Sequence, residues 1–256
     1  MTKLRRLHEE QGQSPWLDNL TRTLVRGGTL KRLVADGVRG VTANPTIFAN
    51  AIEGSDASLA RYGEVIEAYL AGLERLAETS GDLSGIHSVA SFFVSRIDVE
   101  VDRQIRAIDT SRACALMGLA GIAQAKLAYQ SFQHSVGSER WANLAAMGAR
   151  LQRPLWASTS TKNPDRPDTL HVDGLIGPNT INTLPETTIN AFNAHGTLAR
   201  TLDIGVQETT DVVHALADIE IDIELAGATP QDQAIQGFER SYAHILQVLN
   251  AKPRPT

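Results

Sequence analysis

An acid, an amide, a hydroxyl and two cations stand at the ends of short apolar runs in this sequence. They are Asp18, Asn44, Ser91, Arg96 and Lys162. A carboxylate can act as general acid or base, an amide can hold a hydroxyl or carbonyl group, and a guanidinium suits phosphate. The set is therefore compatible with a small anionic substrate held by a few local cations.

Asp18 and Asn44 each allow a catalytic and a structural interpretation. Asp18 follows Trp16 and Leu17, so its carboxylate is expected to be partly desolvated, which favours general acid–base work. The alternative is an acid that caps or pairs near the next helix. Asn44 precedes Pro45 and is biased to extended backbone, where its amide could donate to a substrate. Asparagine is also common in turns, and from spacing alone the turn is favoured.

Ser91, Arg96 and Lys162 could bind a phosphate only under particular geometry. Ser91 and Arg96 are separated by an odd number of residues, so on one regular strand they would face opposite sides. Both reach one ligand if Arg96 lies beyond the strand, in the loop. An ion pair with Asp98 or Glu100 is the alternative. Lys162 ends a run of serines and threonines that could cradle a phosphate, although a solvated lysine is commoner at a strand end.

Metal, nucleotide and disulfide chemistry are not indicated. The 7 histidines include no pair at ligand spacing, and Cys114 is the only cysteine, which excludes an internal disulfide and a thiolate zinc site. Neither a Walker loop nor a Gly-x-Gly-x-x-Gly motif occurs. We therefore expect neither a metal nor a cofactor.

Composition describes a globular chain with a slight acidic excess. The 256 residues are 42% hydrophobic, and 24 Lys+Arg against 29 Asp+Glu give a net charge of −5. A nucleic-acid binder needs a basic excess, so nucleic acid is not an expected partner. No apolar run approaches a membrane span, and the first residues lack a secretory signal. The cysteine content suits a cytoplasmic protein, and the sequence is compatible with an oligomer.

Five runs are predicted to be the strands that position the polar residues: 15–19, 38–43, 87–94, 154–160 and 175–183. Helices are expected between them, over 22–36 and 59–77, and as two helices over 99–134 that meet near residues 109–111, with a last one from Thr229 to Asn250. This alternation predicts an α/β protein with parallel strands, whose sites lie at strand ends. A closed (β/α)₈ barrel needs eight strands, and the pattern supplies five.

Four motifs are long enough to identify a family: WLD at 16–18, TANPTIF at 42–48, SVASFFVSRIDVEVD at 88–102 and LWASTSTKNP at 155–164. Together they resemble transaldolase in its actinobacterial form, and the likeness covers nearly all of the chain. Transaldolases are TIM barrels of the pentose phosphate pathway. They transfer a dihydroxyacetone unit from sedoheptulose 7-phosphate to glyceraldehyde 3-phosphate, giving erythrose 4-phosphate and fructose 6-phosphate, through a Schiff base on a lysine.

The resemblance implies a role for each site residue. Asp18 is similar to the family's first-strand acid/base, and Asn44 to the second-strand amide that holds the bound unit. Ser91 and Arg96 resemble the sixth-strand hydroxyl and the phosphate-binding arginine. Lys162 stands where the family has its seventh-strand phosphate cation, which many relatives supply as arginine. Sugar phosphates are therefore the expected partners.

The sequence departs from the family between residues 52 and 58. Transaldolases carry strands three, four and five in this interval, including the Schiff-base lysine, whereas here Ile52 leads within a few residues to SLARY, which resembles the end of the fifth strand. The expected fold is an incomplete barrel of about five parallel strands in a single domain over 1–256. Its 1–52 region would hold strands one and two, and its 58–256 region strand six to the last helix.

The interval that is absent carries the residue on which dihydroxyacetone transfer depends. The lysines present are Lys3, Lys31, Lys126, Lys162 and Lys252, and only Lys162 lies at a strand end near the expected pocket. It is a weak candidate for the Schiff base, since a nucleophilic lysine must be partly deprotonated near neutral pH. The alternative function is a non-catalytic sugar-phosphate-binding or degenerate transaldolase homologue.

Overall fold

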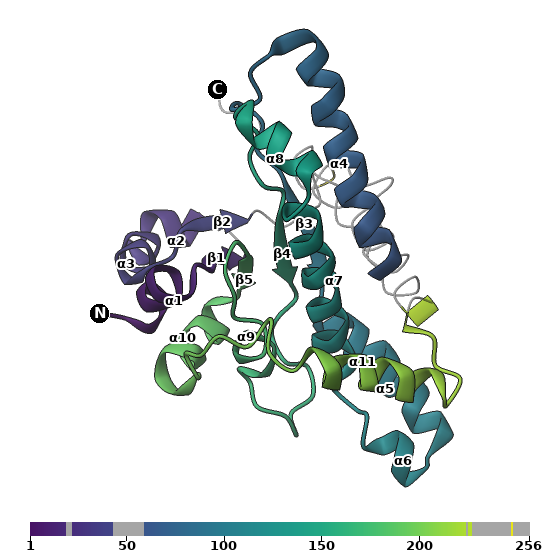
Figure 1. Ribbon diagram of the computed structural model, residues 1–256. Coiled ribbons are helices and arrows are strands. Elements are labelled where there is room, and N and C mark those ends of the chain that lie inside the picture. Colours follow the sequence, from purple (N-terminus) through teal and green to yellow (C-terminus); the bar gives the residue numbers. More distant parts are fainter. Residues whose placement is uncertain (19–21, 43–58, 224, 227–246, 248–256) are drawn as a thin grey trace.

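The computed structural model describes residues 1–18, 22–42, 59–223, 225–226 and 247 (Figure 1). Its strands form one sheet in the order β2-β1-β5-β4-β3, and every pair of neighbours is parallel. The strands are β1 (Ser14–Asp18), β2 (Gly40–Thr42), β3 (Val89–Phe93), β4 (Arg153–Ala157) and β5 (Ile181–Leu184).

This strand order is an arc of a (β/α)₈ barrel. In a closed barrel each strand lies beside its successor, and the last strand pairs with the first. Here β1 lies between β2 and β5, the last described strand, while β4 separates β5 from β3. β2 and β3 are consecutive among the described strands, yet they lie at opposite edges of the sheet. The structure thus confirms an incomplete barrel of five parallel strands.

Helices accompany the strands along the chain. α1, α2, α3 and α10 gather beside β1, and α4, α7 and α11 lie on the side of β3 and β4 (Figure 1). They are α1 (Lys3–Gln11), α2 (Arg22–Arg26), α3 (Thr29–Asp36), α4 (Leu59–Ser80), α5 (Ser95–Ile108), α6 (Ser111–Cys114), α7 (Ala120–Val136), α8 (Glu139–Ala146), α9 (Leu170–Asp173), α10 (Glu186–His195) and α11 (Val206–Ala217).

Alternate strand side chains pack against these helices and define the two faces of the sheet. Leu17 and Leu184 belong to one buried cluster with residues of α1, α3 and α10. Phe92 and Trp156 belong to another with Tyr62 of α4, and their rings meet edge to face at centroid distances of about 6 Å. Because side chains alternate along a strand, the neighbours of these residues face the opposite side, the barrel interior.

Several predicted elements differ in detail from the observed ones. The helix expected over 22–36 is divided into α2 and α3 because Gly28 adopts a left-handed φ of 78°. The strand expected over 175–183 begins only at Ile181, since the preceding residues leave α9 through a turn. Of the two helices expected over 99–134, the first is α5, which begins earlier at Ser95 and ends at Ile108 as predicted, and the second is divided into α6 and α7. The last predicted helix, Thr229 to Asn250, lies almost wholly outside the described residues.

Buried carboxylates fasten α5 to the segments that follow it. Asp98 accepts a hydrogen bond from the Gly121 amide at 2.7 Å, and its other oxygen lies 2.6 Å from His171 Nε2. A Cβ at position 121 would stand 2.6 Å from the Val94 carbonyl oxygen, so only glycine allows α7 to approach this closely. Asp102, one turn later, accepts from the Gly118 amide at 2.8 Å.

Asp102→Asn is expected to raise the stability of the fold above about pH 4. Burial, helped by the charge of Asp98, raises the pKa of Asp102, although the Gly118 amide partly offsets this. A carboxyl whose folded pKa exceeds its unfolded value loses stability as the pH rises from about 4 through the folded pKa. Urea unfolding at several pH values should show this loss diminished in the variant. Asp165→Asn, an exposed change, should leave the pH profile as it is.

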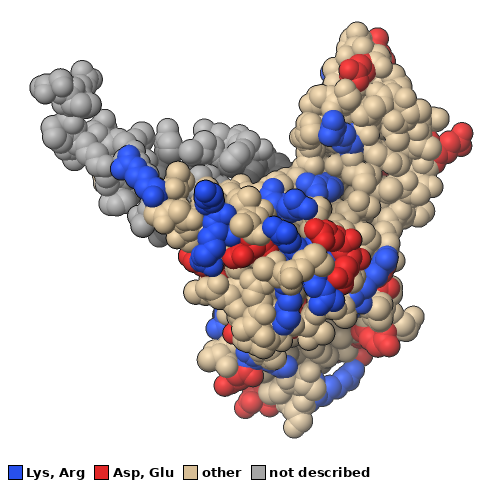
Figure 2. All heavy atoms as spheres, turned by 90° about the vertical axis from the view of Figure 1, so that its left-hand side faces the viewer, with Lys and Arg blue, Asp and Glu red and all other residues tan. Residues whose placement is uncertain are grey.

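Charges of both signs are interspersed on the face formed by the amino-terminal helices. Figure 2, viewed from that side, shows Lys and Arg side chains alternating with Asp and Glu rather than a continuous basic patch. Ion pairs account for part of this mixture, including Arg6 with Glu10 and Arg32 with both Asp36 and Glu186. No described helix is both long and apolar enough to cross a membrane.

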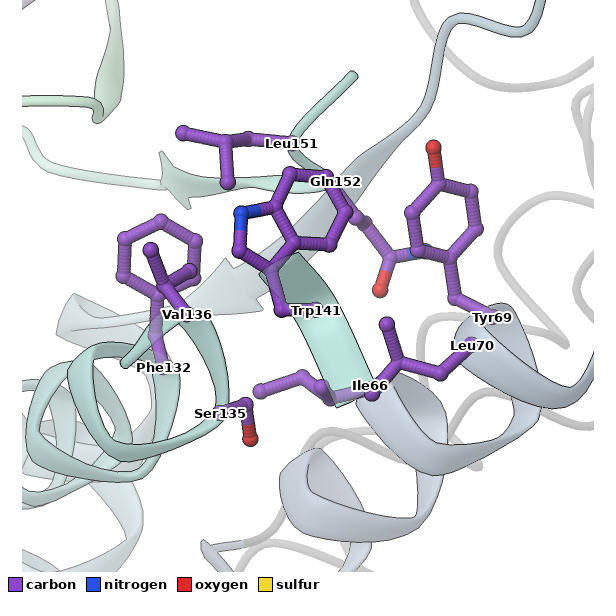
Figure 3. Close-up of a pocket in the computed structure, with 9 residues that line it drawn as sticks. All are labelled: Ile66, Tyr69, Leu70, Phe132, Ser135, Val136, Trp141, Leu151 and Gln152. Atoms are coloured by element: carbon purple, nitrogen blue, oxygen red, sulfur yellow. The ribbon is translucent and has the colours of Figure 1, made fainter. Parts of the chain in front are cut away.

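A small cavity of about 20 Å³ lies between α4, α7 and α8. In Figure 3 the Trp141 indole stands between the rings of Phe132 and Tyr69, with Leu151 closing the space beside it. This volume is room for about one water molecule, and the surrounding side chains are mainly apolar. The cavity is therefore a packing defect of the helical layer, too small for a substrate.

Candidate active site

Three of the predicted site residues that the structure describes lie at the carboxyl end of the sheet, and the fourth, Ser91, lies within a strand. Asp18 is the last residue of β1, Ser91 is at the centre of β3, Arg96 is the second residue of α5, and Lys162 follows β4. Asn44 lies outside the described residues. Because parallel strands end at the same edge, the turns after them converge on one side of the sheet.

Asp18 is held at the end of β1 by the neighbouring strand. It pairs in register with Thr42 of β2, whose Oγ1 donates to Asp18 Oδ1 at 3.1 Å. The carboxylate is half-buried on the interior face, and its Oδ2 meets no donor among the described residues. Asp18 therefore does not cap a described helix; one of its oxygens is oriented by Thr42 and the other can meet a ligand.

Arg96 presents a guanidinium that forms no ion pair with the residues the structure describes. Its Cζ lies 4.6 Å from the centroid of the Phe93 ring, over an interior-facing side chain of β3. Half-burial lowers the pKa of the guanidinium. Asp98 pairs with His171, and Glu100 pairs with Arg103, so neither forms the predicted alternative ion pair with Arg96. Within the described chain Arg96 has no carboxylate partner, which suits it to an external anion.

The position of Arg96 differs from the predicted one in its local structure. It lies beyond the strand, as its separation from Ser91 required, but in the first turn of a 14-residue helix rather than in a loop. The amino terminus of a helix favours anions, so α5 adds to the attraction of the guanidinium. Ser91 is exposed on the same face as Phe93, two residues away, which places its hydroxyl on the side over which Arg96 lies.

Lys162 adds a second cation on the adjacent strand connection. β4 pairs with β3, and the chain turns sharply after β4 at Ser158, whose φ is 56°. Lys162 is exposed, and its Nζ donates to Ser160 Oγ at 2.7 Å. Arg96 and Lys162 thus follow two neighbouring strands, β3 and β4, beyond their carboxyl ends. Asp18 stands apart, because β5 and β4 separate β1 from β3 by about 14 Å in total.

Two residues of this site were not predicted. Thr42 orients Asp18, and Phe93 supports Arg96. Both stand inside the sequence motifs quoted above, where Thr42 precedes Asn44 by two positions and Phe93 ends an apolar run. Alternation along β3 was the available signal, since Ser91 and Phe93 must share the face opposite the buried Phe92.

None of the lysines in the described ranges stands on the interior face of a strand. Lys3 on α1 donates to the Gly196 carbonyl, and Lys126 on α7 donates to the Ile204 carbonyl, both at 2.7 Å. Lys31 is exposed on α3. Lys162 is the only described lysine at the carboxyl end of the sheet, and Lys252 lies outside the described residues. A lysine nucleophile inside the barrel arc is therefore not among them.

Metal binding finds no support in the part of the chain that the structure describes. No three side chains of His, Cys, Asp or Glu gather there as possible ligands. The buried polar residues at the end of β4 serve packing instead, since Thr159 Oγ1 lies 2.8 Å from Asn182 Oδ1 and 3.0 Å from the Thr183 carbonyl. These contacts fix the turn that leads to Lys162.

Comparison with known proteins gives consistent matches. A family model described as Transaldolase/Fructose-6-phosphate aldolase matches residues 57–249. The chain is 47% identical over 211 residues to a Transaldolase of Mycolicibacterium smegmatis, which covers 81% of the chain and 54% of that relative. It is 45% identical over 208 residues to a Transaldolase of Renibacterium salmoninarum, and this alignment covers 81% of the chain and 54% of the relative. A Transaldolase of Mycobacterium leprae is 41% identical over 220 residues, and this alignment covers 85% of the chain and 56% of the relative.

The matched region spans little more than half the length of these relatives, 54% in the first of them. Much of each relative therefore has no counterpart in the alignment. The properties of the whole relatives do not pass directly to this chain.

Proposed function

Because the chain belongs to the transaldolase/fructose-6-phosphate aldolase family, we propose that it binds the sugar phosphates on which transaldolases act. The observation that carries the proposal is the half-buried Arg96 guanidinium, which stacks on Phe93 and meets no carboxylate among the described residues. A phosphate would supply the missing counter-ion through paired charge-assisted hydrogen bonds. The pentose phosphate pathway of the cytoplasm is where such a protein would act.

The proposed binding mode places the phosphate at β3 and β4 and the rest of the sugar toward β1. Arg96 and Lys162 would hold the phosphate, and the exposed Ser91 hydroxyl would donate to a neighbouring oxygen. Asp18, half-buried and oriented by Thr42, would act as general acid or base at the other end of the molecule. Asn44 is proposed to hold the transferred unit, from its place in the motif.

Dihydroxyacetone transfer, from sedoheptulose 7-phosphate to glyceraldehyde 3-phosphate, is the family reaction. For this chain the transfer is a proposal that requires a lysine to form the Schiff base. Lys162 is the candidate, because it is the described lysine at the carboxyl end of the sheet. Its ammonium is exposed to solvent, whereas a Schiff-base lysine is typically desolvated in an apolar pocket.

A second candidate function is sugar-phosphate binding without covalent catalysis. The placement of the lysines favours it, since Lys3, Lys31 and Lys126 lie on helices and Lys162 is exposed to solvent. The residues proposed to bind the phosphate do not include a lysine nucleophile, because Arg96 and Ser91 remain available for binding. Both candidates therefore share the binding site and differ only in the chemistry that follows.

Arg96→Gln is expected to weaken binding of fructose 6-phosphate about tenfold to hundredfold. The variant removes the charge-assisted hydrogen bonds to the phosphate, which contribute about 1.5–3 kcal/mol. Isothermal titration calorimetry on the full chain measures the change. Arg103→Gln is the matched control, because Arg103 lies on the same helix but is exposed and paired with Glu100.

The same titration can contradict the proposal. If the unaltered chain takes up no fructose 6-phosphate at millimolar concentration, the proposed function is wrong. If Arg96→Gln and Arg103→Gln bind equally well, the phosphate is held elsewhere. A thermal melt of both variants shows whether loss of the contact with Phe93 has disturbed the fold instead.

A further inference from the structure

A larger hollow opens at the amino end of the sheet, opposite the candidate active site. It has a volume of about 740 Å³, and its walls come from Trp16 of β1, the residues that lead into β3 and β4, and Trp141 of α8. The arc of strands leaves this interior space open beside β3, the edge strand. A volume of several hundred Å³ is that of typical small-molecule sites.

Arg153 places an uncompensated charge in the wall of the amino-end hollow. It is half-buried at the start of β4, and its Nη1 donates to Ser14 Oγ at 3.1 Å. Burial lowers the pKa of its guanidinium, with no carboxylate acting against this. No described residue forms an ion pair with it. Burying a charge with only one neutral partner costs free energy. Binding of an anion would lower that cost by pairing with the guanidinium.

The rest of the wall combines one further cation, Arg150, with a histidine and apolar surface. Arg150, whose Nε donates to the Ser84 carbonyl at 2.9 Å, and His87 stand at the exposed mouth. Two half-buried indoles, those of Trp16 and Trp141, form much of the apolar lining. Indole faces pack against planar apolar groups and carry a partial negative charge, so they complement the aromatic body of a ligand rather than its anionic group.

We propose that this hollow binds a small aromatic molecule that carries one anionic group, a carboxylate, sulfonate or phosphate. The anion would pair with Arg153, Arg150 would attract it at the mouth and His87 would offer a ring N–H there, while the ring would lie against Trp16 and Trp141. A sugar phosphate lacks the apolar body that the indoles would cover. This site therefore differs, in its place and in its chemistry, from the proposed phosphate-binding residues at the carboxyl end of the sheet.

Naphthalene-2-sulfonate is the probe for this proposal, and binding to the full chain is measured by calorimetry. We expect Arg153→Gln to weaken binding about tenfold or more, the effect of losing a charge-assisted hydrogen bond. The uncharged naphthalene-2-methanol should bind at least tenfold more weakly than the sulfonate. Arg103→Gln, an exposed change on α5, should leave the affinity unaltered. Saturating fructose 6-phosphate should not displace the probe, which separates this site from the proposed function.

Several results would overturn the proposal. They are the absence of binding at millimolar probe, equal affinity of the sulfonate and the alcohol, or displacement of the probe by fructose 6-phosphate. Unchanged affinity in Arg153→Gln would also do so. If that variant fails to melt cooperatively, the exposed pair Arg150→Gln and His87→Gln replaces it, and together they should lower the affinity several-fold. An unchanged affinity in that double variant would contradict the site equally.

Discussion

Treated with fructose 6-phosphate and then with borohydride, the chain is expected to keep its original intact mass. Borohydride reduces a Schiff base to a stable amine, so an enzyme that forms one on a lysine gains the mass of a dihydroxyacetone unit. Lys3 and Lys126 donate to main-chain carbonyls on the helical layer, and Lys162 is exposed. Loss of a covalent catalyst typically costs many orders of magnitude in rate.

A full-length transaldolase, such as that of Mycolicibacterium smegmatis, trapped in parallel shows that the reagents work. An adduct on the present chain would contradict the expectation and support dihydroxyacetone transfer. Peptide mapping should then find the modification at Lys162, and Lys162→Arg should abolish it while keeping the positive charge. If the calorimetry above shows binding and the trap shows no adduct, the chain is a binder without the covalent step.

His171→Ala is expected to lower the free energy of unfolding by about 3–5 kcal/mol. The side chains of His171 and Asp98 are 2% and 9% exposed, and they meet at 2.6 Å. Removing the imidazole leaves the carboxylate buried with only the Gly121 amide as a partner. Urea unfolding followed by circular dichroism measures the change.

His195→Ala supplies a matched control for the buried pair. His195 lies 2.7 Å from Asp168, but the two side chains are 57% and 63% exposed. Exposed pairs of this kind contribute about 0–1 kcal/mol, so this variant should unfold at nearly the original urea concentration. Equal losses in the two variants would mean that burial of the His171 contact adds nothing to stability.

The strands were predictable because each is an apolar run interrupted by turn residues. β2 and β3 lie within the runs predicted at 38–43 and 87–94. β1 and β4 each begin one residue before the runs predicted at 15–19 and 154–160. The fifth was misplaced because Leu175 and Ile176 are as apolar as Ile181, although they pack in the turn after α9. A run of apolar residues indicates that a segment is buried. It does not distinguish a buried turn from a buried strand, because both are apolar.

The state of Arg96 could not be predicted from local sequence. Asp98 and Glu100 are near enough to pair with it, but Asp98 contacts a histidine 73 residues away, and Glu100 faces Arg103 across one helical turn. Tertiary contacts thus explain why neither of these nearby carboxylates pairs with Arg96. Arg153 shows the same limit, because its partly buried charge depends on how β4 and β1 lie together.

β1 cannot pair with β5 until the ribosome has made almost all of the chain between them. Gln13 and Thr180, which meet at the start of this pair, are 167 residues apart in the sequence. At about 5–20 residues per second, a ribosome needs roughly 10–30 s to make the intervening chain. β1 is therefore made well before β5, and during that time Leu17 is without the Leu184 side chain of its buried cluster.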